Sequence, residues 1–220
     1  MNMRWLLVVA VPVALVPPCT VAALRWVNPP TSARIIATRR KGDDIAHEWV
    51  PLDRVAVDMR HAVVVAEDTY FDHHRGFDWH SMRAAWKHNR AHGRQRGAST
   101  ITQQVAKNLF LWPGRSFLRK AIEAYLAIWI EALWPKRRIL EMYLNIAQFG
   151  ESIYGVEAAS QRIFGRSAAD LTSHNAALLA AVLPNPVRYD AGNPSPELRF
   201  RQLRVLKSLE ARRAQFQEPL

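Results

Sequence analysis

Two consecutive apolar patterns with the period of an α-helix constrain the fold of this chain most strongly. In the first, from Ala121 to Trp134, the apolar residues follow an i, i+4, i+7, i+8, i+11 spacing: Ile122, Leu126, Trp129, Ile130 and Leu133. The second, from Lys136 to Phe149, repeats the pattern with Ile139, Leu140, Tyr143 and Leu144. Because Pro135 separates the two and Gly150 is a candidate C-terminal stop, we predict two adjacent amphipathic helices.

Further helices are predicted along the chain. They are an apolar helix that includes 62–66, and helices over Gly155–Phe164, Thr172–Leu183 and Pro194 to about Gln215. No run of alternating apolar and polar residues competes with them, so the predicted fold class is mainly α. The length of 220 residues suits one domain of about 150–200 residues plus an anchor.

The N-terminal stretch from Trp5 to Leu24 contains no charged residue and is bounded by Arg4 and Arg25. Twenty helical residues span about 30 Å, the thickness of a bilayer core, so we predict a transmembrane anchor over residues 1–27. A cleaved signal peptide and a buried core helix are the alternatives. The basic residues after the span outnumber Arg4 before it, which by charge alone favours a cytoplasmic domain.

Residues 28–47 contain Pro, Thr and Arg without periodicity, so we expect a linker there. We expect the globular domain to occupy residues 48–220.

Charge is distributed unevenly along the domain. The chain has a formal net charge of +11, and the 42 residues from Ser81 to Ile122 contain nine Lys or Arg but no Asp or Glu. A basic surplus of this kind indicates an anionic partner: nucleic acid, membrane lipid or a phosphorylated substrate. A solvated basic face is the plain alternative.

The segment AEDTYFDHHRGFD, from Ala66 to Asp78, places Glu67 and Asp68 at the end of an apolar helix. A carboxylate beside an apolar wall is a candidate for a raised pKa and for a general base. A helix-end acid paired with an arginine is the alternative. His73 and His74 are adjacent and poorly spaced for shared coordination, so no metal ligand is predicted.

The segment GASTITQQVAKN, from Gly97 to Asn108, is dense in uncharged hydrogen-bonding side chains. Burying such a run without partners is costly, which favours a groove for sugar hydroxyls, amides or phosphates. A polar loop with a helix cap is the alternative. The apolar run Leu109–Trp112 that follows is a candidate for contact with the membrane interface, or for a turn packed in the core.

The segment RKAIEAYLA, from Arg119 to Ala127, places Arg119 and Glu123 four residues apart on one helix face, with Lys120 beside them. Two cations near a carboxylate can bind a diphosphate, although a surface ion pair is the simpler reading. In the helix from Lys136, we expect Asn145 to support the site without a catalytic role.

These segments, in this order, resemble the monofunctional biosynthetic peptidoglycan transglycosylases of glycosyltransferase family 51. The matching segments are EDTYFDHHRG, GASTITQQ, RKAIE, ILEMYLN with a following YG, and LPNPVRYDAGNP, and together they cover roughly Glu48 to Glu210. The larger members of the family carry a transpeptidase domain after this one. Because this chain stops at Leu220, the monofunctional class is expected. The sequence departs from the family pattern at Ala98 and Asn175, where glycine and an acid are commoner.

The resemblance implies a lysozyme-like helical glycosyltransferase domain and assigns roles by motif position. Glu67 matches the general base, and Glu123 matches a second glutamate that assists at the diphosphate. Lys107, Arg115, Arg119 and Lys120 are expected to neutralise the leaving diphosphate. The remaining expected substrate contacts are Asp68, Phe71, Ser99, Gln104 and Asn108.

The resemblance also implies the partners and the location. It implies lipid II and the growing glycan strand as substrates, membrane lipids and cell-wall synthesis or division proteins as partners, and no nucleic acid. No cofactor is expected to be required, with Mg or Mn at most assisting the diphosphate. The domain is expected outside the bacterial inner membrane, against the charge count. The alternatives are a lysozyme-like lytic enzyme and a membrane-tethered basic binding protein.

Overall fold

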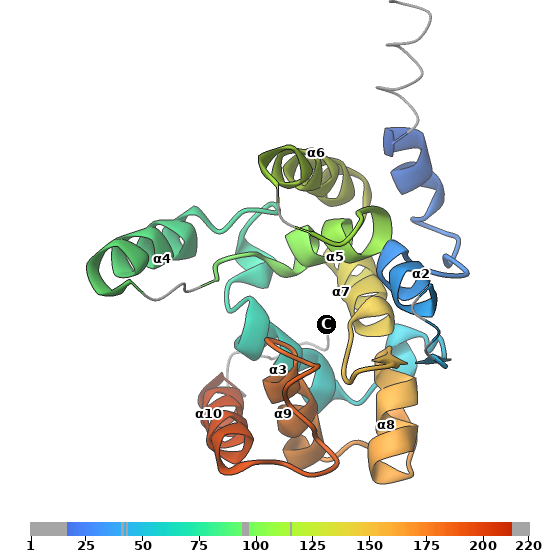
Figure 1. Cartoon of the computed structure of the whole chain (residues 1–220), viewed down its shortest axis with the longest axis vertical. Coiled ribbons are helices and arrows are strands. Elements are labelled where there is room, and N and C mark those ends of the chain that lie inside the picture. Colours follow the sequence, from blue (N-terminus) through green and yellow to red (C-terminus); the bar gives the residue numbers. More distant parts are fainter. Residues whose placement is uncertain (1–16, 41, 43, 94–96, 115, 213–220) are drawn as a thin grey trace, which may run out of the picture.

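The computed structural model describes residues 17–40, 42, 44–93, 97–114 and 116–212 (Figure 1). The prediction of a mainly helical fold is confirmed. The helices are α2 (Ala33–Arg39), α3 (Val57–Glu67), α4 (Trp79–His92), α5 (Ile101–Phe110), α6 (Phe117–Leu133), α7 (Lys136–Ile146), α8 (Val156–Phe164), α9 (Ser173–Val182) and α10 (Pro196–Arg212), with 3-10 turns at Leu52–Arg54, Phe71–His73 and Ala168–Asp170.

The two strongest helical patterns form α6 and α7, on either side of Pro135. Helix α7 ends at Ile146, before the predicted end at Phe149. Its end is earlier because residues 147–149 pair with the chain that follows: Gly155 N donates to Ala147 O at 2.9 Å, and Phe149 N donates to Ile153 O at 2.9 Å.

One short β-pairing was not predicted. Strands β1 (Ala46–His47) and β2 (Ile153–Tyr154) are parallel, with Ala46 opposite Ile153 and His47 opposite Tyr154. Two residues are too few for an alternating pattern to show in a sequence.

The expected linker, residues 28–47, is not irregular throughout. It contains α2, whose N-cap Ser32 accepts a hydrogen bond from Ile35 N, and Ile35 is buried in the domain. Helix α2 packs against α5. Residues 33–39 are therefore a docked helix and not a loosely attached segment, held by the cap, by buried Ile35 and by a hydrogen bond of 2.7 Å between the hydroxyls of Thr38 and Tyr154.

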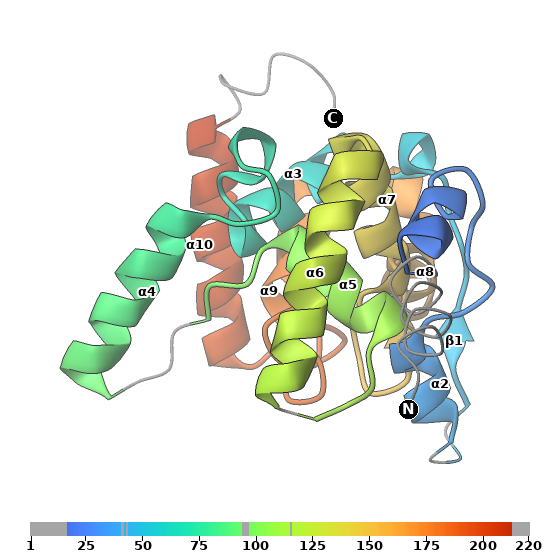
Figure 2. The same cartoon turned by 90° about the horizontal axis from the view of Figure 1, so that it is seen from above.

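The helices form two packed groups (Figures 1 and 2). In one group α3 packs against α9 and α10, and in the other α5 packs against α6 and α7. Helix α4 projects from the side of the molecule in both views. Fully buried Tyr143 and Phe149 belong to a core that is continuous across both groups.

The chain before α2 is docked on the corner between α6 and α7. Residues 17–23 are helical, and Val21 is fully buried. Its carbonyl accepts a hydrogen bond from Trp134 Nε1 at 2.7 Å, and Arg138 donates to the carbonyls of Leu24 and Val27 at 2.9 Å each. Residues 17–27 are therefore held firmly against the domain.

The anchor prediction falls mostly outside the described residues, since these begin at residue 17. Within the described ranges, no helix combines the length and the apolar character that a membrane crossing requires.

Candidate active site

Glu67 is the last residue of α3 and is partly buried. Burial raises the pKa of its carboxyl, while a hydrogen bond from Gln104 and the charge of Lys107 lower it in part. A carboxyl of this kind takes up a proton more readily than an exposed one, and it remains anchored by a neutral donor. The expected general base therefore has the surroundings that such a base needs.

Gln104 connects Glu67 to α7. Its Nε2 donates to Glu67 Oε2 at 2.7 Å, and its Oε1 accepts from the Tyr143 hydroxyl at 3.3 Å. Burial raises the pKa of Tyr143 well above its ordinary value, so this hydroxyl remains a donor. Because the Glu67 carboxylate only accepts, the tyrosine and the glutamate together fix the orientation of the amide.

Asp68 joins the end of α3 to the start of α5. It is 5% exposed, and its two oxygens accept from Ile101 N at 2.9 Å and from His74 Nε2 at 2.8 Å. Gly76 N donates to His74 Nδ1, which leaves the ring proton on Nε2. Asp68 thus fixes the end of α3, which carries Glu67, to the start of α5, which carries Gln104.

The polar run before α5 serves two purposes. Thr100 and Gln103 form a capping box at the start of α5, and Thr100 Oγ1 donates to Gly76 O at 2.7 Å. These two residues fit the helix-cap alternative. Gln104 faces the groove instead, and Ser99 is exposed.

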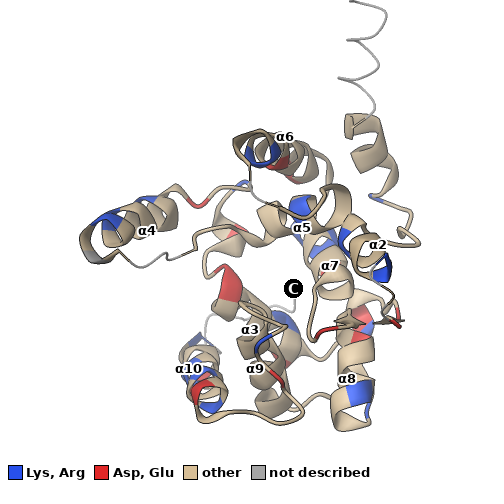
Figure 3. Ribbon diagram, viewed as in Figure 1, with Lys and Arg blue, Asp and Glu red and all other residues tan. Residues whose placement is uncertain are grey.

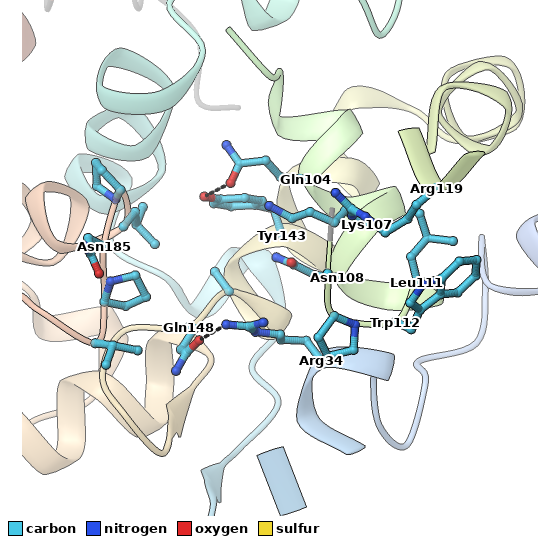
Figure 4. A pocket seen from close by; sticks show the side chains of 17 residues that line it. Arg34, Gln104, Lys107, Asn108, Leu111, Trp112, Arg119, Tyr143, Gln148 and Asn185 are labelled. Carbon is cyan, nitrogen blue, oxygen red and sulfur yellow. Dashed lines mark hydrogen bonds between the residues drawn. The ribbon is translucent and has the colours of Figure 1, made fainter. Parts of the chain in front are cut away.

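A groove of about 500 Å³ opens beside Gln104 (Figure 4). Its lining includes three cations, Arg34, Lys107 and Arg119, and no acidic residue. Burial lowers the pKa of Lys107, and the nearby carboxylate of Glu123 raises it in part. In Figure 3 basic segments of α2, α5 and α6 lie across the middle of the molecule from the acidic end of α3. The groove therefore suits an anion.

Glu123 lies behind this cationic wall and is 2% exposed. Lys120 Nζ lies 2.5 Å from its Oε1, and Arg119 NH1 lies 3.6 Å from its Oε2. Lys120 also donates to Ser99 Oγ at 3.3 Å. The buried carboxylate holds both cations in place and links α6 to the segment before α5.

A divalent cation fits these residues poorly. Glu123 is already paired with two cations, and the described residues contain no group of three or more acidic, histidine or cysteine side chains placed to bind a metal ion.

Glu67 itself belongs to a second hollow of about 250 Å³ that adjoins the groove through Gln104. Asp68, Asp78, Ser81 and Ser99 are among its lining residues. The carboxylate thus lies between two hollows, one polar and partly acidic, the other cationic. This arrangement suits a reaction in which a base acts on one group while an anion leaves on the other side.

The Transglycosylase family model matches residues 33–210. The chain belongs to this family. The biosynthetic peptidoglycan transglycosylase of Xylella fastidiosa (strain 9a5c) is 44% identical over 214 residues, which cover 94% of this chain and 88% of that protein. The protein of the same name from Rhodospirillum centenum is 51% identical over 178 residues, covering 80% and 77%. The counterpart from Aeromonas hydrophila is 47% identical over 194 residues, covering 86% and 83%. The resemblance inferred from the motifs is confirmed.

The predicted site residues of this transglycosylase fall into three sets. Gln104, Lys107, Asn108 and Arg119 line the groove, and Glu67, Asp68 and Ser99 line the second hollow. Phe71, Lys120 and Glu123 line neither. Phe71 is completely buried, with Lys136 Nζ 4.4 Å from the centre of its ring, so it does not reach a substrate directly in this structure. Arg115 lies outside the described residues.

Several residues of the transglycosylase groove were not predicted as site residues, among them Arg34, Tyr143, Gln148 and Asn185. Asn185 lies in the LPNP segment, where the family resemblance was a usable signal. Tyr143 was read as part of an apolar helix face. Arg34 and Gln148 gave no signal in the sequence.

The apolar run Leu109–Trp112, which begins in the last turn of α5, is mostly packed in the core. Leu109 and Leu111 are buried and Phe110 is half-buried, whereas Trp112 is 52% exposed. The core-packed alternative is therefore correct for 109–111. The exposed apolar surface lies farther on, at Phe117 on α6, which is 97% exposed.

Proposed function

We propose that this transglycosylase polymerises the glycan strands of peptidoglycan from lipid II. The observation that carries the proposal is a partly buried carboxyl of raised pKa, Glu67, held by Gln104 at the edge of a cationic groove. The names of its relatives support the same activity.

The proposed reaction transfers a growing chain from its lipid carrier to lipid II. The 4-hydroxyl of the acceptor GlcNAc attacks C1 of the donor MurNAc as Glu67 takes the hydroxyl proton. The bond from C1 to the diphosphate oxygen breaks, and undecaprenyl diphosphate leaves with the electron pair. The α-linked donor becomes a β-1,4 link, so the configuration at C1 inverts.

In this reaction Lys107 and Arg119 neutralise the charge on the leaving diphosphate, which lowers the barrier because the donors are fixed before the reaction begins. Glu123 keeps Arg119 and Lys120 in position. Asn108 and Asn185 supply amides at the groove for phosphate or sugar groups.

The membrane location is part of the proposal. The uncharged span from Trp5 to Leu24 would anchor the enzyme in the cytoplasmic membrane, with the domain on the periplasmic side. Large apolar side chains on α6 support contact with lipid, since Phe117, Leu118 and Ile128 are all exposed. Helix α6 lies on the same side of the molecule as residues 17–23 (Figures 1 and 2).

The test is polymerisation of labelled lipid II by the full chain in detergent. We expect Glu67→Gln to lower the rate by at least about a hundredfold, the usual contribution of a general base. Glu210→Gln, an exposed glutamate on α10, is the matched control and should retain activity. Circular dichroism of each variant checks the fold.

Two outcomes would contradict the proposal. A wild-type enzyme that leaves lipid II unchanged but releases soluble fragments from finished cell wall would be a lytic enzyme. Equal polymerisation by wild type and Glu67→Gln would keep the function but remove Glu67 as the base.

A further inference from the structure

Arg34 lies in the first turn of α2 and lines the cationic groove. Its NH2 donates to Gln148 Oε1 at 3.2 Å. The helix that carries it is fixed by the Ser32 cap and by buried Ile35, and it packs against α5, which carries Lys107. The guanidinium is therefore delivered to the groove from a rigid element.

The placement of Arg34 is not explained by local stability. Gln148 is a neutral partner, and within the described part of the chain Arg34 has no carboxylate in an ion pair. A cation in the first turn of a helix is also opposed by the helix dipole. A half-buried guanidinium under these conditions gains most from an anion supplied by a ligand.

Arg34 extends the cationic lining beyond the pair expected to hold the diphosphate. In Figure 4 Arg34 is seen below Asn108, and Lys107 and Arg119 above it. Burial lowers the pKa of Lys107, and the charges of Arg119 and Arg34 lower it further, so all three cations act on one region. A groove of about 500 Å³ has room for more than a diphosphate.

We propose that Arg34, oriented by Gln148, is a substrate-binding residue that holds an oxyanion of the lipid-linked sugar. The planar guanidinium offers paired donors that match a phosphate or a carboxylate. The oxyanion belongs either to the diphosphate or to a carboxylate of the peptide attached to the sugar. This inference rests on the proposed function.

The first experiment compares steady-state polymerisation of lipid II by wild type, Arg34→Gln and Arg39→Gln, using the full chain in detergent. Arg39 is an exposed arginine on the same helix, so its variant removes the same charge outside the groove. We expect Arg34→Gln to raise KM about tenfold with kcat changed less, the effect of losing one charge-assisted hydrogen bond. Arg39→Gln should stay within about twofold of wild type, as expected for an exposed charge.

The second experiment identifies the oxyanion with two probes, farnesyl diphosphate in calorimetric titration and a lipid-linked disaccharide without peptide as substrate. If Arg34 holds the diphosphate, Arg34→Gln weakens farnesyl diphosphate binding and raises KM for both substrates. If it holds a carboxylate, farnesyl diphosphate binding and KM for the peptide-free substrate stay unchanged while KM for lipid II rises.

Three results would overturn the inference. They are an unchanged KM for lipid II together with unchanged farnesyl diphosphate binding in Arg34→Gln, an equal effect of Arg39→Gln, or a change in kcat alone. If Arg34→Gln does not fold, Arg34→Lys, which keeps the charge but not the paired donors, replaces it in both experiments. If wild type makes no polymer the proposed function fails, and calorimetric titration of wild type and Arg34→Gln with farnesyl diphosphate and with lipid II then tests the Arg34 site alone. Unchanged binding of both probes would overturn it.

Discussion

Asn145 should be one of the most sensitive positions for stability, although it touches no part of the groove. It is completely buried on α7. Its Oδ1 accepts from Val50 N, and its Nδ2 donates to Val50 O and Glu141 O, each at 2.8 Å. The side chain thus replaces a backbone partner for Val50, whose own N–H and C=O are buried.

Asn145→Leu would keep the side-chain size but leave both backbone groups of Val50 unpaired. Each buried unpaired group costs about 1–3 kcal/mol, or about 2–6 kcal/mol for the two. Burial of the leucine offsets about 1–2 kcal/mol, so we expect the free energy of unfolding to fall by about 3 kcal/mol. In a chain of this size that lowers Tm by about 6–12 °C.

Chemical and thermal unfolding of the full chain in detergent, followed by circular dichroism, measure this change. Asn193→Leu, at an exposed asparagine, is the control and should change stability by less than about 0.5 kcal/mol. A loss below about 1 kcal/mol for Asn145→Leu would refute the reasoning, because it would mean that Val50 finds other partners at little cost.

Two further predictions concern backbone space and pH. Gly155→Ala should abolish stable folding, because Gly155 has a φ of 82° and an added Cβ would lie 2.9 Å from Asn145 O. The control is Gly165→Ala, where φ is 64° and an added Cβ would meet nothing within 4 Å. It should cost only about 1 kcal/mol in the same unfolding assay. Gln104→Leu should move the acidic limb of the pH–rate profile to higher pH, because burial already raises the pKa of Glu67 and the lost hydrogen bond favoured its ionised form. Since the base must be ionised to act, activity falls as pH drops through this raised pKa, and a limb that stays in place or moves to lower pH would contradict the role of Gln104.

The sequence was most informative where chemistry or periodicity is local. Helices α6 and α7 follow from apolar spacing, and Glu67, Lys107 and Arg119 follow from motif chemistry. In the polar run Gly97–Asn108, the sequence did not show in the same way which side chains cap α5 and which face the groove. Whether Gln103 or Gln104 faces the groove depends on where α5 begins, and this is set by the capping box of Thr100 and Gln103, with Thr100 also held by Gly76 O from a distant loop.

Arg34 and Phe71 show a second limit. Helix α2 has seven residues, too few for a period to be read, so its arginine was assigned to a linker. Phe71 stands beside polar residues in the sequence, yet it is completely buried in the core and contacts Lys136 from another helix. Both positions depend on contacts between segments that are far apart along the chain.

The docked segment before α2 has a mechanical consequence in the proposed anchored enzyme. Trp134 and Arg138 donate hydrogen bonds to the carbonyls of Val21, Leu24 and Val27, so a chain that left the bilayer at this point would be fixed to the domain and would not pivot on it. The height and tilt of the groove above the lipid would then be set by the α6–α7 corner. Such an enzyme would meet its lipid-borne substrate at a constant angle.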